Sequence, residues 1–176
     1  MKKQKRKRPN LPLESKSIKE RSNEWSDQKS ANIGLYYVSY ELERRGWNVL
    51  ITSRNARGPD MIVYSQSGKK LWTIQVKASR VVKRPCNLGT SMVNFLMSDF
   101  AVICTGVHID SPDLFIAKTT KIWKYSAAAR NLKWKSGGNY INWNEYSQFK
   151  DNFKSLGNPY DVIHRKKRKT KPKKKK

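Results

Sequence analysis

The chain has 176 residues, with 38 Lys or Arg against 13 Asp or Glu, so its net charge at pH 7 is +25. This length suits one domain with its own core, and the charge favours a polyanionic partner, most simply a nucleic acid, because phosphate contacts release counterions. The sequence contains no apolar run suited to a membrane span or a signal peptide, so we expect no membrane partner and an intracellular location.

Both ends of the chain are rich in basic residues. Residues 1–8 carry six positive charges and residues 165–176 carry ten, yet the remainder still holds 22 basic against 13 acidic residues. Their composition predicts a disordered basic arm over 1–22 and a disordered basic tail over 163–176, on either side of a folded domain over 23–162. These ends either bind phosphates or simply add solubility. In a prokaryote the protein would act in the cytoplasm and nucleoid, whereas in a eukaryote the N-terminal basic run would direct it to the nucleus.

Residues 26–45 carry the pattern of an amphipathic helix, with Ser26 or Asp27 as the N-cap and a glycine at its end. Gly34 falls on the apolar stripe, where it would let the helix approach a sheet closely. Glu41 lies at the edge of the same stripe. It is either a solvated acid at the side of the helix or a carboxylate directed at a cation inside the fold.

Three short strands with two turns are predicted over residues 48–79, because β-branched and aromatic runs are interrupted there by turn-forming residues. The second strand, 61–64, directly follows Asp60, whose backbone is restricted by the preceding Gly and Pro. In the third strand a period of two puts Gln75 and Lys77 on the same face. If these two strands pair as a hairpin, a carboxylate, an amide and an ammonium group converge. In the simpler alternative, Asp60 is a turn residue and Lys77 an exposed charge at a strand's edge.

A basic loop follows the third strand and ends around residues 85–89, and further strands come after it. Short apolar runs predict a strand at 100–104, buried on both faces, and another at 114–117, followed by one or two helical turns within 119–129. Asn142 and Glu145 match a capping box for a terminal helix that continues past residue 150. This order predicts an α/β fold in which helices flank a mixed central sheet of about five strands.

The spacing of these motifs resembles the PD-(D/E)XK, or restriction-endonuclease-like, superfamily of nucleases. The resemblance rests on a helix containing Gly34, on Arg57-Gly58-Pro59-Asp60 with the residues before it, and on Ile74-Gln75-Val76-Lys77, and it covers roughly residues 30–157. It extends to a set of small prokaryotic proteins within that group. It implies a restriction-endonuclease-like fold and a Mg²⁺ or Mn²⁺ ion held by Asp60, Gln75 and the carbonyl of Val76, with Lys77 orienting the attacking water.

The sequence departs from this pattern at two positions. Gln75 occupies the place usually filled by Glu or Asp, so it offers an oxygen without a charge and should bind metal more weakly. Leu35 stands where related sequences often carry a Glu directly after the helix glycine. Glu41, two turns further on, is the candidate replacement and completes the predicted catalytic group of Asp60, Gln75, Lys77 and Glu41.

Six further residues are candidates for contacting phosphates, because guanidinium forks and ammonium groups match phosphate oxygens. They are Arg54, Asn55, Arg57, Arg80, Lys83 and Arg84. The sequence therefore predicts a metal-dependent phosphodiesterase that acts on DNA, with a catalytically weak or inactive DNA-binding module of the same fold as the alternative. A basic structural protein would explain the charged ends but not the residues between Asp60 and Lys77. One such site cuts one strand, so cutting both would require a homodimer or two encounters.

Overall fold

The computed structural model describes residues 27–52, 57–127, 129 and 138–161. The predicted basic arm and basic tail lie outside these residues, so their order or disorder stays a prediction. Within the described ranges, no helix has the length and apolar character needed to cross a membrane.

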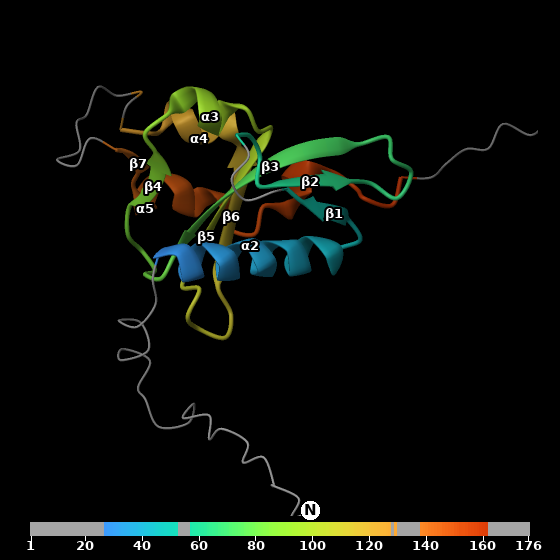
Figure 1. The fold of residues 1–176 in the computed structure, drawn as a ribbon, viewed down its shortest axis with the longest axis horizontal. Helices are drawn as coiled ribbons and strands as arrows, with labels where there is room; N and C mark the ends of the chain where they lie inside the picture. The colour runs from blue at the N-terminus through green and yellow to red at the C-terminus, as the bar shows by residue number, and fades with distance from the viewer. Residues whose placement is uncertain (1–26, 53–56, 128, 130–137, 162–176) are drawn as a thin grey trace, which may run out of the picture.

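A mixed sheet of five strands forms the centre of the molecule, as Figure 1 shows. Its strands follow one another in the order β1-β2-β3-β5-β6, and β3 and β5 are parallel whereas the other neighbours are antiparallel. The predicted mixed α/β sheet flanked by helices is thus confirmed. The strands are β1 (Asn48–Ile51), β2 (Met61–Tyr64), β3 (Leu71–Ser79), β5 (Phe100–Thr105) and β6 (Asp113–Lys118).

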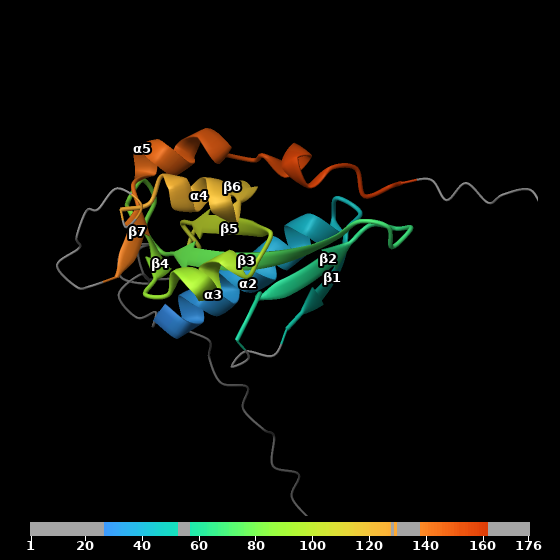
Figure 2. The ribbon, with the colours of Figure 1, turned by 90° about the horizontal axis from the view of Figure 1, so that it is seen from above.

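Different elements cover the two faces of this sheet (Figure 2). Helix α2 packs on one face. The other face is covered by three short helices and a two-stranded antiparallel sheet, β4 with β7. Each face therefore has its own hydrophobic cluster, and all six residues of β5 are buried, as its continuous apolar run predicts. The covering elements are α2 (Asp27–Glu43), α3 (Met92–Leu96), α4 (Thr119–Lys124), α5 (Trp143–Tyr146), β4 (Cys86–Gly89) and β7 (Asn139–Ile141).

The closest approach of α2 to the sheet is at Gly34. A Cβ atom added to this residue would lie 2.4 Å from the Cβ of Ala78 in β3, a distance that forces one of the two elements to move. The predicted close approach is therefore confirmed, and it fixes both the height of α2 above β3 and the rotation of the helix about its axis.

Alanine at position 34 is expected to destabilise the fold by about 1–3 kcal/mol, because the added methyl group overpacks the contact with Ala78. Alanine is intrinsically better than glycine in a helix by roughly 1 kcal/mol, so the steric cost has to exceed this gain. The free energy of unfolding in urea measures the effect. Tyr36→Ala, at an exposed position of the same helix, is the control. A Gly34→Ala protein at least as stable as the wild type would contradict this packing.

The predicted long terminal helix is wrong beyond its first turns. Asn142 and Glu145 form the predicted capping box at the start of α5. However, the chain continues as a 3₁₀ helix, η2 (Ser147–Phe149), and leaves helical geometry at Lys150, which is followed by Asp151 with a φ of 50°. The Asp151 amide donates to the Leu114 carbonyl of β6 at 2.8 Å. Because the edge of β6 binds the chain there, a second 3₁₀ helix, η3 (Phe153–Leu156), replaces the rest of the predicted helix.

The segment after the basic loop also differs from the prediction. Residues 86–89, expected to be the end of the loop, form strand β4, which pairs with β7 about fifty residues later in the chain. Neither strand has a strong local pattern, since each has three or four residues. Their pairing depends on the two segments meeting in space, and this contact is not readable from local sequence.

Candidate active site

The site forms beside the start of β2, where β3 continues beyond it. Met61, the first residue of β2, pairs with Ile74, and the amide of the preceding Asp60 donates to the Ile74 carbonyl at 2.9 Å. Beyond this point β3 runs on from Gln75 to Ser79, paired with β5 on its other side. One edge of β3 is therefore left open to the pocket, with Asp60 at the corner.

The Asp60 carboxylate closes this corner by hydrogen bonding to β3. Its Oδ2 accepts a hydrogen bond from the Val76 amide at 2.7 Å and another from Nε2 of Gln75. The turn before it is fixed as well, since Thr52 Oγ1 donates to the Pro59 carbonyl at 2.6 Å and Gly58 adopts a φ of 133°. Backbone groups alternate in direction along a strand, so the Val76 carbonyl faces the same open edge as its amide.

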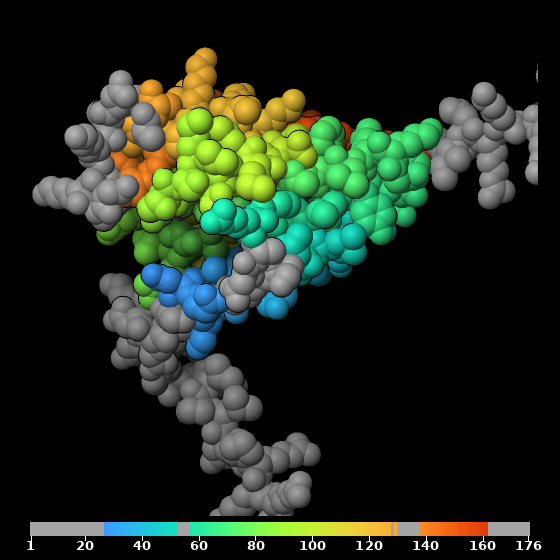
Figure 3. Space-filling model, turned by 45° about the horizontal axis from the view of Figure 1, so that its top comes forward, coloured from blue at the N-terminus to red at the C-terminus, as the bar shows by residue number. Residues whose placement is uncertain are grey.

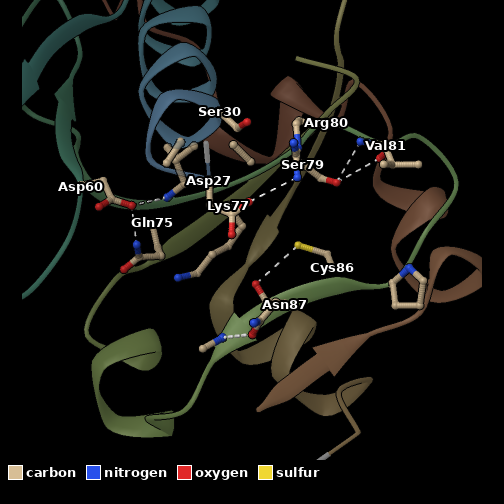
Figure 4. Close-up of a pocket in the computed structure, with 15 residues that line it drawn as sticks. Asp27, Ser30, Asp60, Gln75, Lys77, Ser79, Arg80, Val81, Cys86 and Asn87 are labelled. Atoms are coloured by element: carbon tan, nitrogen blue, oxygen red, sulfur yellow. Dashed lines mark hydrogen bonds and ion pairs between the residues drawn. The ribbon is translucent and has the colours of Figure 1, made fainter. Parts of the chain in front are cut away.

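Gln75 and Lys77 extend from β3 toward the same side, as Figure 4 shows. The period of two predicts this arrangement, because the alternate residues Ile74 and Val76 pack in the cluster beneath α2. The Lys77 side chain reaches toward β4, where a Cβ atom added to Gly89 would lie 4.0 Å from its Nζ. The structure thus brings Asp60, Gln75 and Lys77 to one pocket, and their chemical roles stay predictions.

The pocket is an open cleft of about 630 Å³ between α2 and β4. Its floor is the free edge of β3, one wall is the first turn of α2, and the opposite wall is β4 with the loop before it (Figure 4). An open cleft of this kind suits a polymer strand that passes across it better than a small molecule that is enclosed.

Two polar residues of this pocket were not predicted from the sequence as site residues. Asp27 and Ser30 line the cleft from the first turn of α2, and Asp27 lies 3.6 Å from Nη2 of Arg80. The sequence does contain a signal for them. Ser30 lies four residues before Gly34, and Asp27 lies three residues before Ser30. This spacing puts them on the same side of the helix as Gly34, which packs against β3. Asp27 thus puts a second carboxylate on the rim of the cleft.

The structure does not bring Glu41 to this pocket. Glu41 lies fourteen residues after Asp27 in α2, which corresponds to roughly 21 Å along a helix axis. It is 7 % exposed and lines a separate pocket beside Asp113 and Lys150. There it accepts hydrogen bonds from Arg45 and, at 3.1 Å, from Arg44. Burial favours a higher pKa for the Glu41 carboxyl, but these hydrogen bonds and charges outweigh it and lower the pKa.

Glu41→Gln is expected to lower the free energy of unfolding by about 1 kcal/mol at pH 7, with no effect on any cleavage. Since the pKa of Glu41 is lowered in the folded state, its stabilisation is present above the ordinary pKa of glutamate and disappears as the pH falls through the lowered value. The two melting temperatures should therefore converge once the pH lies below the lowered pKa of Glu41. Glu43→Gln, on the exposed side of α2, is the control, and a difference that persists in acid would contradict the ion pair.

The predicted phosphate-binding residues fall into two groups. Arg54 and Asn55 lie outside the described residues. Arg57 is exposed three residues before Asp60, and Arg80 lines the pocket from the start of the loop between β3 and β4. Lys83 and Arg84 are exposed in the same loop. The Tyr146 hydroxyl donates to the Arg84 carbonyl at 2.7 Å and so ties this loop to α5. Of the described basic residues, Arg80 therefore lines the cleft, while Lys83 and Arg84 are exposed in the loop that leads to one of its walls.

The oxygen atoms beside the start of β2 are of the chemical type that binds a hard divalent cation. They are the carboxylate of Asp60, the carbonyl of Val76 and the side-chain oxygen of Gln75, all oxygens of the type that Mg²⁺ and Mn²⁺ prefer. The Gln75 amide points its nitrogen at Asp60, so it has to turn before its oxygen can bind a cation. No group of three or more His, Cys, Asp or Glu residues suited to a metal occurs among the described residues.

Comparison with known proteins gives distant structural likeness alone. No protein-family model matches the chain, and no curated protein matches it either. Among solved structures, a Holliday junction resolvase from the archaeal hyperthermophile Archaeoglobus fulgidus is similar, with a TM-score of 0.39 and 13 % sequence identity. The alignment covers 64 % of this chain and 91 % of the resolvase. A likeness at this level does not assign the chain to a family.

Proposed function

We propose that this protein is a metal-dependent phosphodiesterase that acts on DNA, with its site at Asp60, Gln75, Val76 and Lys77. One observation carries the proposal: a carboxylate, an amide side chain, a strand residue with its carbonyl at the open edge and an ammonium group line one open cleft beside β3. Hydrolysis of a phosphodiester requires positive charge near the phosphate and a positioned water molecule, and these groups can provide both.

Each residue has a distinct role in this proposal. Asp60, the Val76 carbonyl and the turned Gln75 side chain would hold Mg²⁺ or Mn²⁺, and the bound ion stabilises the negative charge that develops on the phosphate. The Val76 amide fixes the orientation of the Asp60 carboxylate through its hydrogen bond. Lys77 places an ammonium group beside this corner, where it binds a phosphate oxygen and orients the attacking water.

The proposed substrate is a polyanion because of the charge around the cleft. Arg80 lines the cleft, and Lys83 and Arg84 are exposed in the loop that forms one of its walls. The net charge of the whole chain is +25. The choice of DNA rests on the resemblance of the Asp60 and Gln75-Val76-Lys77 motifs to DNA nucleases, so an RNA duplex is the comparison substrate.

Cleavage of supercoiled plasmid and of branched DNA tests the proposal directly. We expect nicking that requires Mg²⁺ or Mn²⁺ and stops on addition of EDTA. Nicked circles that accumulate before linear DNA would indicate cleavage of one strand at a time, whereas direct linearisation would indicate a homodimer. An unmodified protein that cuts neither DNA with either metal would overturn the proposal.

A second function is favoured by one feature of the same site. The Gln75 amide donates a hydrogen bond to Asp60, so the two side chains are compatible without a bound cation. A glutamate at position 75 would instead repel the Asp60 carboxylate. The corresponding candidate is a DNA-binding module that retains the fold but has lost catalysis. Its expected behaviour is tight, salt-dependent DNA binding that EDTA does not change.

A further inference from the structure

The short helix α3 and its C-cap residue expose three apolar side chains: Met92 is 48 %, Val93 70 % and the C-cap Met97 50 % exposed. Of the five residues of α3, Phe95 is buried, and its ring packs 6.2 Å from the ring of Trp123 in α4. Leu96 is half-buried against the same cluster, so the helix is held from one side while Met92 and Val93 are exposed. We call Met92, Val93 and Met97 the α3 apolar surface. A cluster of exposed apolar side chains beside a binding cleft is a reason to look for a partner.

The α3 apolar surface lies beside the proposed site. The segment that carries it starts at Gly89, which lines the cleft next to Lys77. It ends at Asp99, whose carboxylate accepts hydrogen bonds from the Thr73 amide at 2.9 Å and from the Thr73 hydroxyl at 2.8 Å. Thr73, Gln75 and Lys77 share one face of β3 by the period of two. Residues 89–99 are thus fixed at both ends to the strand that carries the proposed catalytic groups.

The surroundings of this surface are positively charged on two sides. Lys77 lies toward the cleft, and Lys118 and Lys124 are exposed at the two ends of α4, which packs beside α3. Figure 3 looks onto this face and shows the light-green atoms of α3 on one side of the cleft, with the blue first turn of α2 on the other. Residues 89–99 contain one acidic residue, Asp99, and its carboxylate accepts a hydrogen bond from the Thr73 amide. The ligand that suits such a surface is anionic and has flat apolar faces.

We infer that the α3 apolar surface contacts unstacked bases next to the phosphate bound at Lys77, so that the preferred substrate is DNA with unpaired bases. This inference rests on the proposed function and narrows its substrate class. In a continuous duplex the faces of the bases are covered by stacking, and the exposed groups are phosphates, sugars and polar base edges. Valine and methionine side chains gain little from those groups, but they gain apolar contact with a base that has left the stack at a fork, gap or branch.

The test compares binding of a splayed fork and of a full duplex with equal numbers of nucleotides, in EDTA and at one salt concentration. Fluorescence anisotropy gives the two affinities for the wild type and for the triple variant Met92→Ser, Val93→Ser, Met97→Ser. We expect the wild type to prefer the fork, and the triple variant to lose about tenfold on the fork with little change on the duplex. Leu71→Ser is the control, because Leu71 is 56 % exposed at the far end of β3 from Lys77.

A fluorescent base analogue in the DNA completes the test. A 2-aminopurine placed at the unpaired position of the fork should change its fluorescence when the wild type binds and not when the triple variant binds at saturation. Equal wild-type affinity for fork and duplex, or an equal loss on both in the triple variant, would overturn the inference. So would a change of oligomeric state in the triple variant, or binding of anionic vesicles through this surface, since α3 would then dock a second copy or a membrane.

The outcomes separate this inference from the proposed function. Metal-dependent nicking with no preference for unpaired bases would leave the phosphodiesterase proposal intact and remove the role of α3. A fork preference that depends on α3, in a protein that never cuts, would support the contact with bases and remove the proposed catalysis.

Discussion

Asp60→Asn is expected to reduce metal-dependent cleavage by at least about a thousandfold, because Asp60 supplies the negative charge of the proposed metal-binding group. Asparagine keeps an oxygen that can accept the hydrogen bond from the Val76 amide, so the fold and DNA binding should change little. Asp60→Ala removes that acceptor as well and should also cost about 1–3 kcal/mol of stability. The rate of plasmid nicking and the melting temperature, measured on the same preparations, separate these two effects.

The matching change to the positively charged side chain of the site is Lys77→Ala. We expect it to reduce cleavage by about a hundredfold to ten-thousandfold, with DNA binding largely retained. Two exposed residues outside the cleft provide controls of the same charge type. Asp110→Asn and Lys69→Ala should both cut as the wild type does. Cleavage that survives in Asp60→Asn would place the chemistry elsewhere or reveal a contaminating nuclease.

Gln75→Glu is expected to strengthen metal binding and to make stability depend on metal. The substitution removes the amide that donates to Asp60 and places a second carboxylate next to the first, so the two charges repel in the absence of a cation. At pH 7 without metal, the variant should therefore be less stable than the wild type by about 1–3 kcal/mol. Addition of Mn²⁺ or Mg²⁺ at about a hundredfold its dissociation constant should restore about 2.7 kcal/mol, which corresponds to several degrees in Tm.

Thermal unfolding with and without metal measures this effect, and calorimetric titration gives the affinity. Gln66→Glu, which also removes an amide hydrogen bond but lies on the exposed turn between β2 and β3, should show no response to metal. If Gln75→Glu gains cleavage where the wild type has none, the second candidate, a module that has lost catalysis, is supported. A Gln75→Glu protein that neither loses stability nor responds to metal would contradict the arrangement of Asp60 and Gln75 described above.

Much of the sheet follows from local sequence. The strand at 61–64 has the predicted bounds, and 100–104 and 114–117 are each one or two residues longer in the structure. Local pattern succeeds here because side-chain alternation and continuous apolar runs reflect burial directly. The same reasoning placed Gln75 and Lys77 on one face of β3, which needs no knowledge of the partner strands.

The capping box shows where local pattern stops being sufficient. Asn142 and Glu145 set the start of α5, as predicted, because a cap requires contacts within a single turn. The predicted end of that helix was wrong, because the Asp151 amide instead donates to the Leu114 carbonyl of β6, more than thirty residues earlier in the chain. Strands β4 and β7 were missed for a related reason, since their pairing joins two short segments that are distant in sequence.

The sequence by itself determined the strands of the central sheet, their alternation and the identity of the polar groups that converge beside the start of β2, since each depends on neighbours a few residues apart. Tertiary structure alone decided which end of α2 faces the cleft. The contact between Gly34 and Ala78 fixes the position of that helix on the sheet, and it leaves Asp27 and Ser30 beside Gln75 and Lys77 while Glu41 pairs with Arg44 and Arg45 in another pocket. Helical periodicity defines which side chains share a face, but the position of a helix along a strand depends on packing between elements far apart in the chain.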